Sequence, residues 1–182
     1  MTPIEQLHRR ALADADDTIR ALTPTMMPAP SHCAGWTIED LLCHMVGQNF
    51  GFAAAITDGD ADRSAYLPKP RTLWGESRAA LTAAIDGDPA DQVRLIEIRQ
   101  EAIPLEVVLA IHTLDLAVHV WDAVGNAYRP SPDIVDLVVA QAERIPTDRG
   151  DDAVFAPVLA IESGDAWHRA LGLLGRRPDR AA

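Results

Sequence analysis

PLEVVLAIHTLDLAVHVWDAVG, residues 104–125, is the stretch of this 182-residue sequence that decides its fold. It is apolar on nearly every side, which is typical of a helix surrounded by neighbouring helices. Pro104 is a favourable first helical residue, and the helix is expected to end before Gly125. The stretch therefore predicts a long central helix in the core of an all-α protein.

One side of this predicted helix starts apolar and turns polar. Its residues follow one another at spacings of three and four: Leu105, Val108, His112, Asp115, His119 and Asp122. At roughly 100° per residue, these spacings confine all of them to an arc of about 100°. Buried imidazoles and carboxylates cost several kcal/mol unless they are paired or bind a metal. The chain must therefore supply partners for this polar stripe.

A metal ion is one such partner. Asp115 and His119 are four residues apart, so their Cβ atoms lie about 6 Å from each other on one face. Both can then bind one ion at bond lengths of about 2.0–2.2 Å. His112 and Asp115 could do the same, whereas His112 and His119 are about 10.5 Å apart along the axis and are not expected to share an ion. A stable zinc site needs a third ligand from elsewhere.

The stretch GWTIEDLLCHMVGQNFGF, residues 35–52, predicts a second helix that supplies this ligand. Thr37 can cap the helix with its hydroxyl, and acidic residues follow in the first turn. His44 is the candidate third ligand. Gly47 and Gly51 lie on nearly the same side, where the missing side chains leave room for another helix or a ligand.

Three protein ligands with one open position are typical of a catalytic metal. Asp122 could orient His119 as a hydrogen-bond acceptor behind the metal, and His112 could assist from its place on the same stripe. Without a metal, the same residues would form a His/Asp hydrogen-bond network that fixes the register of the helices.

The remaining histidines and the cysteines carry weaker signals. His8, His32 and His168 lie near exposed or irregular stretches and are expected at the surface. Cys33 precedes the second predicted helix and could overhang the same end of the bundle as His44. No base or cause of a lowered pKa is visible beside it, so Cys33, like Cys43, is interpreted as a small buried apolar residue.

Further helices are predicted around the central one. Apolar spacings and start or stop residues place them at residues 3–22, 37–57, 72–86 and 132–145, with a last one from Ser163–Asp165 to Gly175. Residues 93–99 fit a short strand and a frayed helix equally well. No βαβ alternation or repeat is visible, so residues 1–175 are expected to form one helical bundle domain. Residues 176–182 are expected to form a loose tail.

Composition limits the classes of partner. Sixteen Lys and Arg against 27 Asp and Glu give a net charge of −11, which repels nucleic acids and anionic membrane surfaces. Two cysteines are too few for a disulfide framework, and the N-terminal segment lacks the apolar core of a signal peptide. A cytoplasmic protein without nucleic acid or membrane partners is therefore expected.

Three segments carry a resemblance to a known family. They are Cys33 to His44 (CAGWTIEDLLCH), Asp115 to Asp122 (DLAVHVWD) and Leu174 to Pro178 (LGRRP). The sequence resembles the actinobacterial branch of the DinB-like superfamily, which includes the mycothiol-dependent maleylpyruvate isomerases. The resemblance extends over almost the whole chain.

The resemblance implies a four-helix bundle that binds a divalent metal, usually zinc, through His44, Asp115 and His119. Characterised members use this metal to activate the thiol of a small cofactor, which is mycothiol in actinobacteria. Two departures are visible: Asp115 stands where those isomerases carry Glu, and their additional C-terminal domain is not expected here.

Two functional hypotheses follow. In the first, the protein is a zinc-dependent, thiol-using isomerase or S-transferase that acts on a small electrophilic substrate with mycothiol as cosubstrate. In the second, the bundle binds a small molecule without catalysis, and its metal is structural and closed by a fourth ligand, for which His112 is the candidate. A homodimer formed through an outer helix face is a further expectation.

Overall fold

The computed structural model describes residues 1–97, 101–149, 154–161 and 164–178. The long helices and the strands are α1 (Pro3–Ala21), α2 (Ile38–Asp58), α3 (Trp74–Asp86), β1 (Gln92–Val93), β2 (Ile103–Pro104), α4 (Leu105–Val124), α5 (Pro132–Ala142) and α6 (Ala166–Leu173). Single turns of 3-10 helix connect them at η1 (Pro24–Met26), η2 (Arg63–Tyr66), η3 (Arg71–Leu73) and η4 (Gly125–Ala127). The prediction of an all-α fold is confirmed.

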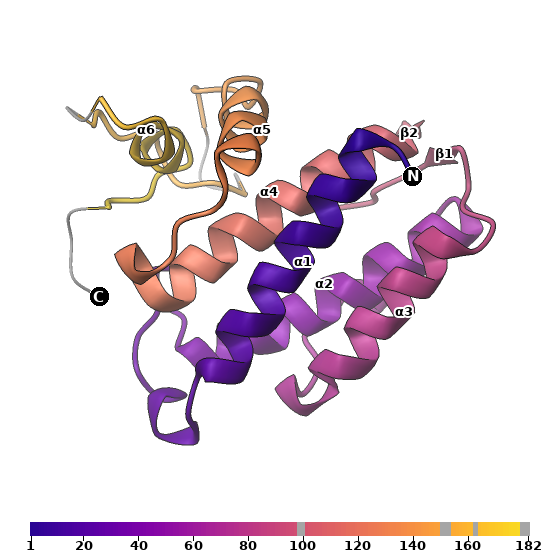
Figure 1. Cartoon of the computed structure of the whole chain (residues 1–182), viewed down its shortest axis with the longest axis horizontal. Coiled ribbons are helices and arrows are strands. Elements are labelled where there is room, and N and C mark those ends of the chain that lie inside the picture. The colour runs from indigo at the N-terminus through magenta and orange to yellow at the C-terminus, as the bar shows by residue number, and fades with distance from the viewer. Residues whose placement is uncertain (98–100, 150–153, 162–163, 179–182) are drawn as a thin grey trace.

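Helices α1 to α4 form the four-helix bundle (Figure 1). Helix α1 packs along α4, α2 packs along α3, and α2 also contacts α4. Helix α5 lies against α4 and α6 against α5, so the C-terminal part of the chain is added to the α4 side of the bundle. This arrangement places the polar stripe of α4 beside α1, α2 and the C-terminal residues.

The two strands form a small antiparallel pair in which Gln92 lies opposite Pro104 and Val93 opposite Ile103. Residues 93–99 fitted a strand and a frayed helix equally well, and the structure places only Val93 of this segment in a strand. Residues 98 and 99 lie outside the described residues. The pair brings the chain from α3 to the start of α4.

A capping box fixes the start of α2. The Thr37 hydroxyl accepts a hydrogen bond from the backbone N–H of Asp40 at 3.1 Å, and the Asp40 carboxylate accepts one from the Thr37 N–H at 3.0 Å. These reciprocal bonds satisfy backbone donors that the helix leaves free. Because His44 follows Thr37 by about two turns, the cap also determines where that imidazole lies.

Helix α4 is buried over most of its length, as its apolar sequence predicted. By length and composition, the segment Leu105–Ala127 is long and apolar enough to cross a membrane, but 78% of its most apolar 18-residue window is buried inside the protein. Helices in protein cores can be equally long and apolar, and the neighbours of α4 supply its apolar surroundings here.

A pair of histidines joins α1 to α4. His8 is fully buried (0% exposed), so the prediction that it lies at the surface was wrong. His8 Nε2 and His112 Nδ1 share a hydrogen bond of 2.9 Å, and the His112 ring lies against Phe52 with ring centroids 4.3 Å apart. Burial lowers the pKa of His8, and it lowers the pKa of His112 to about 4. Both rings are therefore neutral at pH 7.

The residues after α6 pack back onto the bundle, so the prediction of a loose tail was wrong for residues 176–178. The side chain of Arg176 is 11% exposed and binds Asp122, and Asn126 Nδ2 donates a hydrogen bond to the carbonyl of Pro178. The local sequence of this segment shows no apolar period that would predict packing. Arg176 is held instead by the carboxylate of Asp122, which lies far away in the sequence. Residues 179–182 lie outside the described residues, as does Ser163 at the predicted start of the last helix.

The glycines of α2 admit a neighbouring segment rather than a ligand or another long helix. A Cβ on Gly47 would lie 2.4 Å from the backbone oxygen of Leu67, and one on Gly51 would lie 2.2 Å from the Tyr66 ring. Tyr66 and Leu67, at the end of η2, therefore occupy the space beside Gly47 and Gly51. Close approach of this connection to α2 requires a missing side chain at Gly47.

We expect Gly47→Ala to lower the free energy of unfolding by about 1–3 kcal/mol, because the added methyl overlaps backbone atoms that cannot rotate away. Gly75→Ala is the matched control: no atom lies within 4 Å of a Cβ there, and alanine is the better helix former by up to about 1 kcal/mol. Urea unfolding followed by circular dichroism measures both. Equal stability of the two variants would contradict the packing argument.

Candidate metal centre

Three side chains meet between α2 and α4: His44, Asp115 and His119. Each offers one nitrogen or oxygen atom, and these three atoms all lie within 4.8 Å of one another. His44 comes from α2, while Asp115 and His119 lie one turn apart on α4. The side-by-side packing of the two helices brings together residues that are far apart in the sequence.

The donor set fits a divalent metal such as zinc. Two imidazole nitrogens and one carboxylate oxygen are the ligand types of many catalytic zinc sites. In a tetrahedral site with bonds of about 2.1 Å, neighbouring ligand atoms lie about 3.4 Å apart. The distance from His119 Nε2 to Asp115 Oδ1 is 3.3 Å, so this pair is already spaced as two ligands of one ion.

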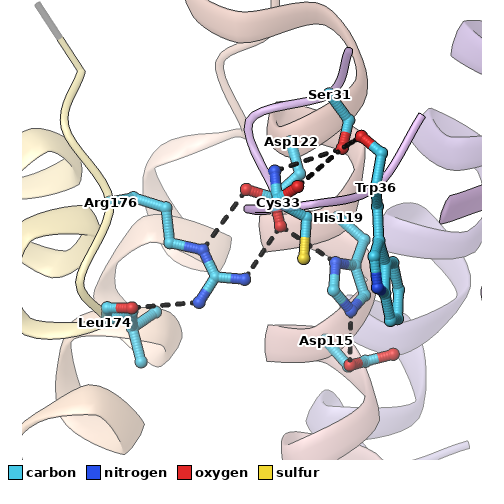
Figure 2. A network of polar contacts seen from close by, with 8 residues as sticks. All are labelled: Ser31, Cys33, Trp36, Asp115, His119, Asp122, Leu174 and Arg176. Carbon is cyan, nitrogen blue, oxygen red and sulfur yellow. Dashed lines mark hydrogen bonds and ion pairs between the residues drawn. The ribbon is translucent and has the colours of Figure 1, made fainter. Parts of the chain in front are cut away.

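His119 is held from both sides of its ring (Figure 2). Nδ1 lies 3.0 Å from Oδ2 of Asp122, which is fully buried, and Nε2 faces Asp115. Burial opposes a charge on His119, but the two carboxylates outweigh it and raise the pKa to about 9. Without a metal, His119 is therefore an imidazolium at pH 7 that donates toward both carboxylates.

The two carboxylates stay ionised. Burial alone would raise the pKa of Asp115, but the charge and the hydrogen bond of His119 hold it far below its usual value. Burial would likewise raise the pKa of Asp122, and the hydrogen bonds and charges of His119 and Arg176 hold it low. Both groups can therefore accept hydrogen bonds or bind a cation at pH 7.

His44 lies between two aromatic rings. Its centroid is 4.9 Å from that of Trp36 and 5.1 Å from that of His119, which it meets edge-on. Burial lowers the pKa of His44, so at pH 7 the ring is neutral and keeps a lone pair for a metal.

The loop before α2 closes over the same end of α4. The backbone N–H of His32 donates to the carbonyl of Asp122 at 2.8 Å, and the His32 ring lies against Trp121 with centroids 4.5 Å apart. His32 is half-buried, as is His168 on α6, so both keep part of their surface exposed. Within the loop, the backbone N–H and the hydroxyl of Ser31 both donate to the carbonyl of Trp36 at 2.9 Å, which ties Trp36 to the loop.

Cys33 belongs to this loop and lies close to the network in Figure 2. It is half-buried and packs against the core. Burial, together with the charges of Asp122 and Asp115, raises the pKa of its thiol. A thiol that stays protonated at pH 7 is a weak nucleophile, so Cys33 has no activated role here.

His112 is not part of the three-residue cluster. It faces α1, where its Nδ1 bonds to His8, although it lies on the same stripe of α4 as Asp115. The ring of His112 therefore does not lie where a fourth ligand of this centre would have to be.

Arg176 is the residue of this region that the sequence interpretation missed. Its Nη2 lies 2.8 Å from Asp122 Oδ2 and its Nε lies 3.2 Å from Oδ1, so it grips the carboxylate that also holds His119 (Figure 2). The one available signal was its place in the LGRRP motif, residues 174–178.

Comparison with known proteins identifies relatives across most of the chain. Two relatives, Uncharacterized protein MT0763 and Uncharacterized protein Rv0738, come from strains of Mycobacterium tuberculosis. Each is 26% identical over 157 residues, which cover 82% of this chain and 84% of the relative.

Solved structures support the same fold. The crystal structures of the mycothiol-dependent maleylpyruvate isomerase and of a point mutant of it match with TM-scores of 0.63 and 0.62, at 16% identity over 78% of this chain and 70% of theirs.

Residues 8–124 match the family described as mycothiol maleylpyruvate isomerase N-terminal domain. This match spans α2, α4 and the three clustered side chains, and it covers more than half of the sequence. The chain therefore belongs to the mycothiol maleylpyruvate isomerase N-terminal domain family.

Proposed function

We propose that this protein is a zinc-dependent, thiol-using enzyme, an isomerase or S-transferase that joins the thiolate of mycothiol to an electrophilic carbon of a small substrate. The observation that carries the proposal is the meeting of His44, Asp115 and His119 between α2 and α4. Family membership and the named activity of the structural relative support mycothiol as the thiol.

His44, Asp115 and His119 would hold the metal and leave one position for the thiol. When bound, zinc would lower the pKa of a coordinated thiol so that it reacts as a thiolate. Asp122 accepts the Nδ1 proton of His119, which directs the Nε2 lone pair toward the metal position. Trp36 lies against His44 and limits how far that ring can turn.

Zinc affinity should rise with pH. His119 has a pKa of about 9 without metal, and binding through Nε2 requires that its second proton leave. The metal therefore competes with one proton, and we expect the apparent affinity to increase by about tenfold per pH unit from pH 7 to 9 and then level off. His44 is already neutral in this range and adds no slope.

Competition with a chromophoric chelator at each pH measures this profile. An affinity that is flat between pH 7 and 9 would show that His119 does not lose a proton to the metal.

Removal of His44 should abolish both metal binding and thiol chemistry. We expect His44→Ala to bind zinc more than about 100-fold more weakly, since only the α4 ligands remain. His168→Ala removes a histidine on α6 and should keep the wild-type zinc content. Metal analysis of untagged protein purified without added metal, followed by a screen of mycothiol with small electrophiles, tests both variants.

The outcomes separate the hypotheses. Full zinc content in His44→Ala would refute the ligand assignment. Wild-type protein that is free of metal and binds none would favour the hydrogen-bond network that fixes helix register. Zinc without conjugation or isomerisation of any electrophile would favour a structural metal.

A further inference from the structure

Arg176 forms a buried ion pair with the carboxylate behind the metal centre. Its guanidinium contacts both oxygens of Asp122, at 2.8 and 3.2 Å, and its third nitrogen, Nη1, donates to the carbonyl of Leu174 at 2.9 Å. The Asp122 side chain is 0% exposed and that of Arg176 is 11% exposed. Two-point contact of this kind fixes the plane of a carboxylate as well as its position.

The same carboxylate oxygen serves both neighbours. Asp122 Oδ2 accepts from Arg176 Nη2 and lies 3.0 Å from Nδ1 of His119. Rotation of the carboxylate would break both contacts together. The orientation of the His119 ring is therefore tied, through one oxygen atom, to a residue of the C-terminal segment.

The C-terminal segment 174–178 also packs against the rest of the chain at other points, and Leu174 is fully buried in the core. The guanidinium carbon of Arg176 lies 5.7 Å from the centroid of the Phe155 ring. The side-chain amide of Asn126 donates a hydrogen bond to the carbonyl of Pro178. Arg176 is the member of this segment that reaches α4 with a charged group. Docking of the segment thus places a positive charge beside the carboxylate that orients a candidate ligand.

We propose that Arg176 is a positioning residue for the metal centre, and that docking of segment 174–178 and binding of the metal stabilise each other. The inference rests on the proposed function, because it takes His119 as a metal ligand. Coupling between two binding events is reciprocal: if the docked segment raises metal affinity by a given factor, the metal stabilises the docked segment by the same factor.

Arg176→Met tests the first half of this coupling. Loss of the direct outer partner of a metal-ligating histidine, here Asp122, weakens metal binding by about 10–100-fold. Because Arg176 acts one contact further out, through Asp122, we expect a loss of zinc affinity of about tenfold. Arg176→Lys should recover part of it, because lysine keeps the charge but makes a single-point contact. The substituted Co²⁺ protein should also change its visible absorption spectrum in Arg176→Met, since the ring of one ligand is no longer held.

Arg149→Met is the matched control. Arg149 also lies over Phe155, at 5.9 Å, and donates to the carbonyl of Leu173 at 2.7 Å. It therefore anchors the same C-terminal region without touching Asp122. Arg149→Met should bind zinc as the wild type does, whereas equal losses in both variants would show that general loosening of the C-terminal region, and not Arg176, is responsible.

Hydrogen exchange of the wild-type protein tests the second half without any substitution. Addition of zinc should slow exchange of the backbone amides of residues 174–177 by up to the same factor, about tenfold. Wild-type protein that binds no zinc would overturn the proposed function. Wild-type protein that binds zinc, with unchanged affinity in Arg176→Met or unchanged exchange in segment 174–177, would overturn this inference alone.

Discussion

The buried carboxylate of Asp122 is the constraint on which the rest of this region depends. A buried charge is stable only when it is paired and hydrogen-bonded, and the partners of this carboxylate come from α4 and from the C-terminal segment. His119 lies one turn before it on α4, Arg176 follows α6, and the backbone of His32 bonds to the carbonyl of the same residue. The carboxylate of Asp122 therefore brings the C-terminal segment to the end of α4, and its backbone carbonyl brings the loop before α2 to the same place.

The polar stripe of α4 divides among different neighbours rather than serving one site. His112 turns to α1 and pairs with His8, whereas Asp115 and His119 face His44 on α2. Asp122 turns to the C-terminal segment. Each polar group of the stripe thereby has a polar partner. Of the stripe residues, Asp115 and His119 are the two that face His44 and could bind a metal with it. The division also explains how a helix with four ionisable residues on one stripe remains a core helix.

The local sequence could predict what depends on helical period and capping. The spacing of Asp115 and His119, the cap at Thr37 and the burial of α4 follow from rules that act over one or two turns. The partners of His8 and Arg176 could not be predicted in this way. Both are polar side chains in ordinary-looking segments, and their burial is decided by residues more than 50 positions away. Such tertiary pairing leaves no periodic signal in the sequence.

Charge balance would favour an anionic ligand, such as the thiolate of the proposed function, on a metal at this centre. In the protein without metal, the carboxylates of Asp115 and Asp122 are balanced by the imidazolium of His119 and the guanidinium of Arg176. Exchange of one imidazolium proton for a divalent ion would leave the cluster with one net positive charge. A partly buried site resists such an excess because low polarity weakens its screening. An anionic ligand at the open position would restore neutrality, and a deprotonated thiol supplies that single negative charge.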